Sequence, residues 1–263
     1  MAVFFEFVRK SFQQRFVYRM NSYVAIISTW LGLFIMISVW QALFRGKEAV
    51  NGVTFEDILN LVVINTVVGS LLRSRMGQKI GERVADGTIS IDLIRPYSFK
   101  SYYVADSLGD NLFGFLFSTI PATALAVVIW GFRLPDDPAR IGLFLLSLLG
   151  GLLLMFQINY MFGLIAIWLK TSWIVNAVTD AAFDLFAGIF VPLWFYPQWL
   201  YAIAQCLPFH LVTFRPISIF LGKTTIAGAW LIIGAQAVWM LVLLVIERWM
   251  WRRAQVKFDV FGG

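Results

Sequence analysis

The run IGLFLLSLLGGLLLMFQINYMFGLIAIWL, from Ile141 to Leu169, contains no charged residue. It is longer than the roughly 20 apolar residues that an α-helix needs to cross a bilayer. Only 14% of the 263 residues are charged and 60% are hydrophobic, whereas an ordinary soluble domain has about 25% charged residues. A soluble fold of this size would lack the polar side chains to cover its surface. The sequence therefore predicts an all-α, polytopic membrane protein.

Six segments are predicted to span the membrane, within a single domain that covers residues 1–263. Besides residues 141–169, they are residues 23–43, 55–72, 107–130, 173–194 and 225–246. Thr54 and Asp57 have the spacing of a capping box, which predicts the start of the second spanning helix. Pro121 lies in the middle of the third span, where a neighbouring helix can accommodate a kink.

Lysine and arginine residues are distributed unevenly between the two ends of these spans. With the N-terminus inside, the inner side holds four in the N-terminal segment, six in the loop of residues 73–100, one at Lys170 and four after the last span. The outer side holds the other six of the 21. Cytoplasmic loops carry the excess of basic residues, so both termini are predicted to be cytoplasmic. The net charge of +6 follows from this topology, and no nucleic-acid partner is expected.

Residues 1–20 form a separate element before the first span. Charged and amide residues take one side of a predicted helix, and the other side is apolar, with Phe4, Phe5, Val8, Phe12 and Phe16. A helix of this kind lies along the inner leaflet, with its basic residues among the lipid headgroups. The sequence therefore predicts an amphipathic interfacial helix that contacts membrane lipid.

Two features suggest enzymatic or metal chemistry that the rest of the sequence does not support. The stretch FLGKTT, residues 220–225, lacks the first glycine of a phosphate-binding loop, because position 217 is Ile217. His210 is the single histidine and Cys206 the single cysteine, which excludes a histidine pair, a cysteine-based metal site and an intrachain disulfide. No catalytic residue, metal site or cofactor is predicted in this chain.

Polar residues inside the spans are candidates for function. Asn176, Asp180 and Asp184 are spaced by four and share one helical face. An acid within the membrane is costly and usually faces protein or a water-filled cavity. The stripe is interpreted either as a polar seam between helices or subunits, or as the lining of a translocation path or a coupling-proton site. Asp106 and Asp110, near the start of the third span, are interpreted as acids that suit a positive helix end.

Two stretches carry a family likeness. One is IGERVADGTISIDLIRPYSF, residues 80–99, which follows the pattern of a helix, then glycine, threonine and an apolar residue, then a motif similar to LLRP. The other is AGIFVPLWFYPQWLYAIAQCLPFHLVTFRPISIFLG, residues 187–222. Its matching positions are Gly188, Pro192, Pro197, Trp199, Leu207, Pro208, Phe209, Pro216 and Gly222. In this order of elements, the chain resembles the permease subunits of ABC-2 type exporters over essentially its whole length. The likeness is closest to a branch that is often encoded as two different permeases with one ATPase.

The resemblance implies that the loop of residues 73–100 contains a coupling helix that docks into a groove of an ATPase subunit. A helix over residues 73–85, followed by an apolar patch at Ile89, Ile91, Leu93 and Ile94, would suit a soluble partner. The residues expected to make this contact are Lys79, Glu82, Arg83, Asp86, Ile89, Ile91 and Arg95. Because this chain has no ATP-binding motif, ATP and magnesium are expected to bind the ATPase.

The resemblance also implies a role for the outer hairpin, residues 195–222. Prolines in this region forbid one continuous helix, and QWLYAIAQ between them is predicted to be a short amphipathic helix. In the family, such re-entrant helices cap the path between two permeases. The residues expected to shape this cap are Pro192, Pro197, Trp199, Pro208, Phe209 and Pro216.

The function implied is that of a transmembrane subunit of an ATP-driven exporter in a bacterial-type plasma membrane. It would form the substrate path with a second permease, identical or homologous, and bind two ATPase subunits. An ion-coupled secondary transporter that uses Asp180 and Asp184 is the alternative, although the two halves show no repeat. An intramembrane enzyme would need a cluster of acids, histidines or cysteines, and those two aspartates alone offer one. The sequence does not indicate the substrate.

Overall fold

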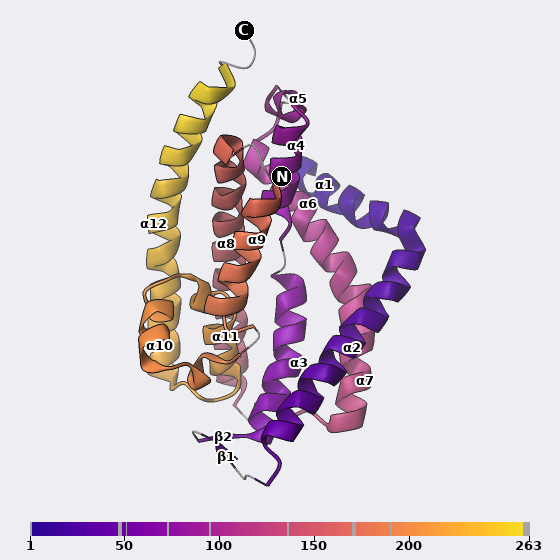
Figure 1. Cartoon of the computed structure of the whole chain (residues 1–263), viewed down its shortest axis with the longest axis vertical. Coiled ribbons are helices and arrows are strands. Elements are labelled where there is room, and N and C mark those ends of the chain that lie inside the picture. Colours follow the sequence, from indigo (N-terminus) through magenta and orange to yellow (C-terminus); the bar gives the residue numbers. More distant parts are fainter. Residues whose placement is uncertain are drawn as a thin grey trace.

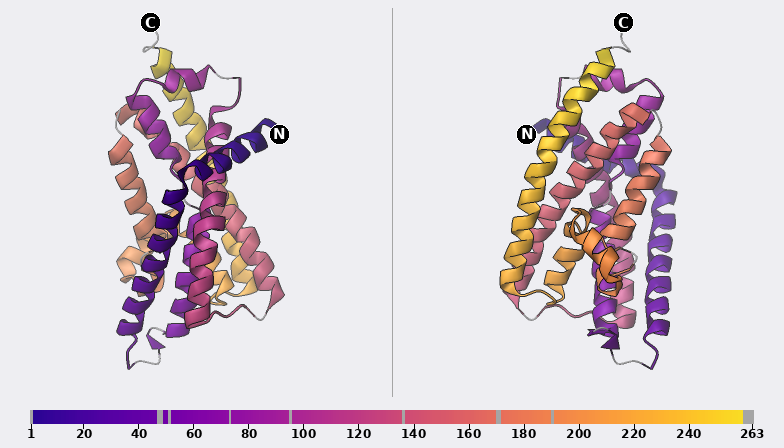
Figure 2. Two further views of the ribbon diagram at one scale, coloured as in Figure 1. Left: turned by 90° about the vertical axis from the view of Figure 1, so that its right-hand side faces the viewer. Right: turned by 60° about the vertical axis from the view of Figure 1, so that its left-hand side comes forward.

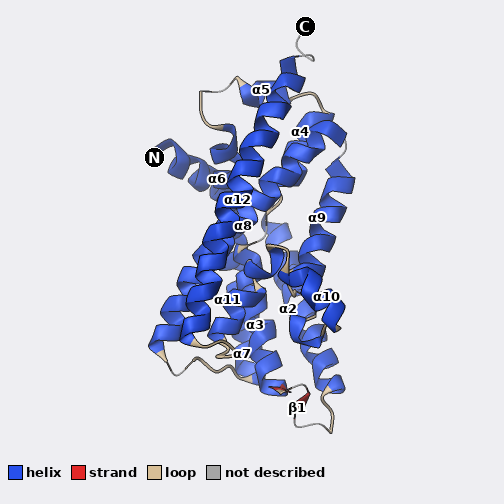
Figure 3. Cartoon of the chain, turned by 90° about the vertical axis from the view of Figure 1, so that its left-hand side faces the viewer, coloured by secondary structure: helices blue, strands red, loops and turns tan. Residues whose placement is uncertain are grey.

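The structure is a computed structural model of the chain, and it describes residues 2–46, 49–50, 52–72, 74–94, 96–135, 137–169, 172–189 and 191–259. Within them the fold is built from helices, and the strands are the two-residue β1 (Ala49–Val50) and β2 (Val53–Thr54). These strands pair antiparallel, with Ala49 opposite Thr54. Figure 3 shows how small the strand content is beside the helices.

The α-helices follow one another along the chain with short connections. They are α1 (Ala2–Gln14), α2 (Arg19–Leu43), α3 (Phe55–Leu71), α4 (Met76–Ala85), α5 (Ile89–Leu93), α6 (Phe99–Gly114), α7 (Ile120–Trp130), α8 (Pro138–Leu169), α9 (Ser172–Phe186), α10 (Gln198–Gln205), α11 (Phe214–Phe220) and α12 (Ile226–Asp259). A 3₁₀ turn, η1 (Arg15–Tyr18), joins α1 to α2, and a π-helical turn, η2 (Phe115–Thr119), joins α6 to α7. Two more 3₁₀ turns, η3 (Leu193–Phe195) and η4 (Phe209–Leu211), lie in the outer hairpin.

Five helical segments of the described chain are long and apolar enough to cross a membrane: Tyr23–Leu43, Phe55–Ala85, Phe99–Trp130, Pro138–Leu169 and Ile226–Gln255. A bent pair, Gln198–Gln205 with Phe209–Phe220, makes a sixth if it counts as one span; its two parts meet at 76°. The chain is therefore an all-α polytopic membrane protein, as its composition predicts. The predicted capping box is confirmed, because the Thr54 hydroxyl accepts from the Asp57 N–H and the Asp57 carboxylate accepts from the Thr54 N–H.

Several predicted boundaries need correction. The helix predicted at 173–194 ends at Phe186, and its fifteen residues are about 22 Å long, shorter than a hydrocarbon core of about 30 Å. Gly188, with a φ of 73°, turns the chain away from the axis of α9. The predicted helix over residues 1–20 stops at Gln14. The last helix continues past residue 246 to Asp259.

The third span begins at Phe99 and not at residue 107. Asp106 and Asp110 therefore lie two to three turns inside α6, too far from its start to be explained by the positive helix end. Pro121 lies inside the Phe99–Trp130 segment, two residues after the end of the π-helical turn η2.

The long helices, such as α2, α3, α8 and α12, run roughly along the long axis of the molecule (Figure 1). One end carries α4, α5 and the C-terminal end of α12, and we call it the α5 end. The β1–β2 hairpin lies at the opposite end, which we call the hairpin end. The N-terminal helix α1 also lies toward the α5 end and projects sideways from the bundle (Figure 2).

Helix α8 is the centre of the main hydrophobic core, which joins side chains of α3, α4, α8, α11 and α12. A second core joins α2, α3 and α7, through residues such as Leu33, Val62 and Ala122. Outside these cores many large apolar side chains are exposed, among them Val128 at 82% and Leu231 at 77%. Exposed apolar surface of this extent is expected of helices that face lipid or another subunit.

The outer hairpin, residues 195–222, folds back against α8 and α9. The predicted short helix QWLYAIAQ is present as α10, with Pro197 at its N-cap. The Thr213 hydroxyl donates to the Ala187 carbonyl at 2.6 Å, and the Tyr196 hydroxyl donates to the Leu185 carbonyl at 2.6 Å. These bonds tie both arms of the hairpin to the end of α9. Of the side chains predicted to shape a cap, Trp199 is exposed, whereas Phe209 packs against Phe183 with ring centroids 5.2 Å apart.

Candidate functional site

The buried side of α4 fixes this helix to α8. Met76 and Ile80 are fully buried in the main core. Gly77 and Gly163 lie where the two helices meet: a Cβ added to Gly163 would come within 3.3 Å of the Gly77 Cα and 2.7 Å of the Ile80 Cδ1. The small residues allow the backbones to approach closely, so α4 is expected to move together with α8.

The opposite side of the α4–α5 segment, which we define as residues 76–94, is exposed at the α5 end. Ile91 is 49% exposed and Ile94, which directly follows α5, is 82% exposed. Glu82 and Asp86 are also exposed. The segment therefore presents apolar and acidic side chains together at one end of the molecule.

Some of the predicted ATPase contacts face inward. Ile89 is 6% exposed and belongs to the main core. The prediction that Ile89 is a surface contact is therefore wrong. Asp92 is buried and accepts a hydrogen bond from the Tyr103 hydroxyl at 2.8 Å, and the Arg83 Nε lies 3.7 Å from the same carboxylate. Arg83 is thus held partly inward. Arg95 lies outside the described residues.

A network of charged residues links α4, α6 and the N-terminal segment. The Lys79 ammonium pairs with Asp106, and its Nζ lies 2.9 Å from Asp110. Arg15 donates two hydrogen bonds to Asp110, at 2.7 Å and 2.6 Å, and the Ser11 hydroxyl donates to Asp106. The bonds to Asp110 raise the pKa of the Arg15 guanidinium. Lys79, predicted to contact an ATPase, is instead committed to this network.

Close packing supports this network. Gly109 lies between the two aspartates of α6, and a Cβ there would come within 2.5 Å of the Val8 carbonyl oxygen and 2.9 Å of the Phe12 nitrogen. Helix α1 therefore rests directly on α6. Sequence reasoning missed the network, although the four-residue spacing of Asp106 and Asp110 places both acids on one face of a helix.

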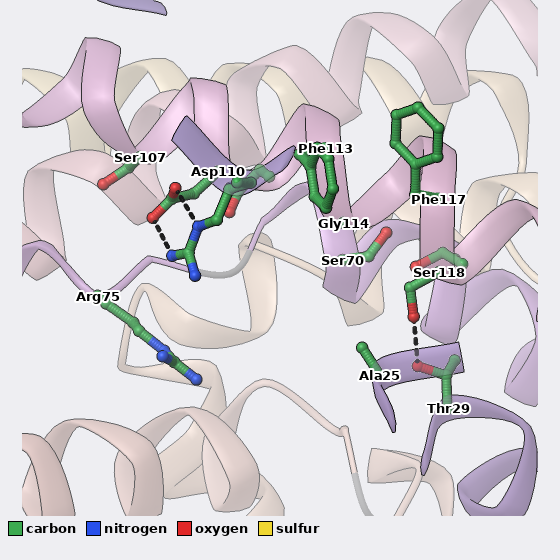
Figure 4. Close-up of a pocket in the computed structure, with 13 residues that line it drawn as sticks. Ala25, Thr29, Ser70, Arg75, Ser107, Asp110, Phe113, Gly114, Phe117 and Ser118 are labelled. Atoms are coloured by element: carbon green, nitrogen blue, oxygen red, sulfur yellow. Dashed lines mark hydrogen bonds and ion pairs between the residues drawn. The ribbon is translucent and has the colours of Figure 1, made fainter. Parts of the chain in front are cut away.

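Three hollows follow one another from α4 into the bundle. The inner hollow, of about 400 Å³, is lined by Lys79, Glu82, Arg83, Asp86, Asp106 and Asp110, among others. The middle hollow, of about 280 Å³, shares Arg15 and Asp110 with the inner one (Figure 4). The deep hollow, of about 530 Å³, shares Thr29, Ser70 and Thr119 with the middle one. Together they form a polar groove, and we use that name below.

Figure 4 shows how the middle hollow is bounded. Asp110 and Arg75 lie toward one side of it, and Thr29 and Ser118 toward the other. The hydroxyls of Thr29 and Ser118 are hydrogen-bonded at 3.1 Å, which links α2 to η2. The ion pair of Arg15 with Asp110 therefore stands between the inner and middle hollows.

The deep hollow contains the acids that the sequence singles out. Asp180 and Asp184 line it from α9, opposite residues of α2 and α3. Asn176, on the same predicted stripe, is not among its lining residues. The structure adds Asn65 of α3 and Asn159 of α8 to the wall, which sequence reasoning did not select. Both are polar residues within apolar spans, and that contrast could have identified them.

Residues 21–262 match a family model described as ABC-2 family transporter protein. The chain belongs to the ABC-2 transporter family. The match includes the spanning helices, the α4–α5 segment and the outer hairpin, so it confirms the resemblance drawn from two local stretches. No curated protein is significantly similar to this ABC-2 protein. Family membership and the apolar helices together identify it as a multi-pass membrane permease of ABC-2 type.

Proposed function

We propose that this ABC-2 protein is the transmembrane subunit of an ATP-driven exporter, with the α4–α5 segment as its ATPase-docking surface and the polar groove as part of its substrate path. The observation that carries the proposal is the two-sided α4–α5 segment. It is anchored in the bundle by Met76 and Ile80, yet it exposes Ile91 and Ile94 at the α5 end. Burial of one such side chain against a partner would contribute about 1.5–3 kcal/mol.

The ATPase would bind ATP and magnesium and would dock at the α5 end. That end would then face the cytoplasm with both chain termini, in a bacterial-type plasma membrane. An exporter of this kind carries two ATPase subunits, one for each permease. Exposed ion pairs at Glu82 or Asp86 would add little, since such pairs contribute about 0–1 kcal/mol.

The charged network could transmit a movement of the ATPase to the helices within the membrane. Charge-assisted and bidentate hydrogen bonds are the strongest of their kind in proteins. Lys79 joins α4 to α6, and Arg15 joins α6 to η1, the turn that leads into α2. A displacement of α4 would therefore shift α6 and α2, the helices that form the wall of the middle hollow.

A second permease, identical or homologous, would complete the substrate path. The deep hollow opens at the surface of this chain and is not enclosed by it alone. The outer hairpin would cap the path on the far side of the membrane, and lipid would cover the remaining apolar faces. The alternative of an ion-coupled transporter draws on the same Asp180 and Asp184, but gives no role to the exposed Ile91 and Ile94.

Recovery of the ATPase with the permease tests this proposal. The double substitution Ile91→Asp with Ile94→Asp should sharply reduce the ATPase recovered with affinity-tagged permease from detergent extracts. Ser90→Asp is the charge control, because it adds one of the two negative charges at an exposed residue of α5 without removing an apolar side chain. Equal recovery with all three proteins would refute docking at α5.

A further inference from the structure

Four of the hydroxyl groups in the wall of the deep hollow share one hydrogen-bonding property, because each already donates to a backbone carbonyl. Two others, those of Thr29 and Ser74, are hydrogen-bonded to serine hydroxyls. The Thr66, Ser70, Thr179 and Thr213 hydroxyls donate to backbone carbonyls of residues 62, 67, 175 and 187 at 2.6–2.9 Å. Their oxygens therefore present lone pairs, and not O–H groups, to anything in the hollow.

Each of the two asparagines in the wall also gives one of its two N–H groups to a backbone carbonyl. The Asn65 Nδ2 donates to the Ile189 carbonyl at 2.9 Å, and the Asn159 Nδ2 donates to the Met155 carbonyl at 3.0 Å. The Asn65 Oδ1 is buried and has no hydrogen-bond partner among the described residues. A buried acceptor without a donor is costly, and a ligand that supplies an N–H would remove that cost.

The charged residues of the wall also favour a ligand that donates hydrogen bonds and carries a positive charge. Asp180 and Asp184 place carboxylates in the wall, and carboxylates are acceptors alone when ionised. Among the described lining residues there is no lysine, arginine or histidine. The inner and middle hollows differ, because Lys79, Arg15 and Arg75 line them.

The rest of the wall is apolar, with Leu33, Met36, Val62, Phe183 and Val212. A volume of about 530 Å³ lies within the range of about 300–1,000 Å³ that is usual for small-molecule sites. Such a wall can hold a hydrophobic body while the acceptors surround one polar end.

We infer that the deep hollow binds amphipathic organic cations that carry N–H donors, such as a protonated amine on an aromatic body. The inference rests on the proposed function in treating this hollow as part of a substrate path, and it adds the class of cargo. The ammonium would lie among the carboxylate, amide and hydroxyl oxygens, and the aromatic body against the apolar wall.

A binding measurement without any ATPase tests the inference. The purified full-length permease in nanodiscs would be titrated with three dansyl probes of similar shape: dansylcadaverine, its neutral N-acetyl derivative and the anionic dansyl-aminohexanoic acid. Binding to empty nanodiscs is subtracted. We expect the amine to bind at least tenfold more tightly than the acid, with the neutral probe between them.

Two variants separate charge from shape. Asp180→Asn with Asp184→Asn should remove most of the preference for the amine. Gly69→Leu should weaken all three probes, because Gly69 lines the deep hollow and a Cβ there would meet open space. Gly234→Leu is its control, since Gly234 also has open space but lies on α12 outside the hollow.

Equal affinity for amine and acid, an unchanged preference in the double aspartate variant, or wild-type binding by the Gly69→Leu variant would each overturn the inference. The binding measurement contains no ATPase, so its result is independent of docking. If the α5 variants lose the ATPase but still bind the amine, the docking proposal is supported and the cargo inference is unaffected. If amine binding fails but the ATPase is still lost in the α5 variants, the cargo inference fails and the docking proposal is unaffected.

Discussion

Arg15, in the turn between α1 and α2, forms a bidentate ion pair with Asp110 of α6, ninety-five residues away in the chain. The same carboxylate accepts from Lys79 of α4. One aspartate of α6 thus binds both α4 and the turn that joins α1 to α2. We expect Asp110→Asn to lower stability by about 1–3 kcal/mol, since two cations lose their shared counter-charge. Thermal unfolding in detergent measures the effect.

The control for that variant is Arg9→Gln. Arg9 pairs with Glu6 at 3.5 Å, and both side chains are at least half exposed. A surface pair of this kind contributes almost nothing to stability, so its melting temperature should match the wild type. If the Asp110→Asn variant had the same melting temperature as the Arg9→Gln variant, the network would have no structural role.

The contact of α1 with α6 at Gly109 gives a second prediction. Gly109→Ala should displace α1, because the added Cβ would meet backbone atoms of Val8 and Phe12. Overpacking of this kind costs about 1–3 kcal/mol, and trypsin should then cleave faster at Arg9 and Lys10. Gly114→Ala, on the same helix but with open space around the Cβ, should leave the melting temperature and the cleavage rate unchanged or improved. Similar cleavage of both variants would count against close packing at Gly109.

A third prediction concerns the orientation in the membrane. In a Cys206→Ser background, Ser90→Cys at the α5 end should react with an impermeant maleimide only from the cytoplasmic side. Leu134→Cys, which is 67% exposed in the connection between α7 and α8 at the hairpin end, should react only from outside. Labelling of intact cells and of inside-out vesicles distinguishes the two. The reverse pattern would place the α5 end outside and exclude it as an ATPase contact.

The acids of α9 give a fourth prediction. Asp180→Asn with Asp184→Asn should reduce ATP-driven uptake of dansylcadaverine into inside-out vesicles at least tenfold, while ATPase recovery stays normal. Asn176→Ala should transport like the wild type, because Asn176 does not line the deep hollow. Normal uptake by the double variant would show that the aspartates serve packing or subunit contact and not transport.

Local sequence patterns were sufficient to predict most of the helices. Apolar runs, the capping box at Thr54 and the prolines of the outer hairpin act within a few residues, so their effects are visible in sequence. Partner choice between distant helices leaves no such pattern, which is why the pairing of Arg15 with Asp110 was missed. The start of the third span was misplaced because the polar face of α6, with Asp106 and Asp110, is paired within the protein and interrupts the apolar run.

The candidate site was predicted only in part, because its local spacing is visible in the sequence and its contacts between helices are not. The spacing of Asp180 and Asp184 fixes their common face, and the structure places both in the wall of one hollow. Asn176 shares the spacing, yet whether it reaches the hollow depends on where α2 and α3 lie against α9. In the α4–α5 segment, the apolar patch was evident from the sequence. The rotation of the short helix α5 was not evident, and it determines that Ile89 is buried while Ile91 and Ile94 are exposed.

Cross-linking at Ile94 tests the central claim most directly. In the Cys206→Ser background, Ile94→Cys would be labelled with a photoreactive maleimide and irradiated in membranes that also contain the ATPase, with Leu134→Cys as the matched exposed position at the hairpin end. The account predicts a permease–ATPase cross-link from position 94 and none from position 134. Absence of the cross-link at 94, or equal cross-linking from both positions, would contradict docking of the ATPase on α5.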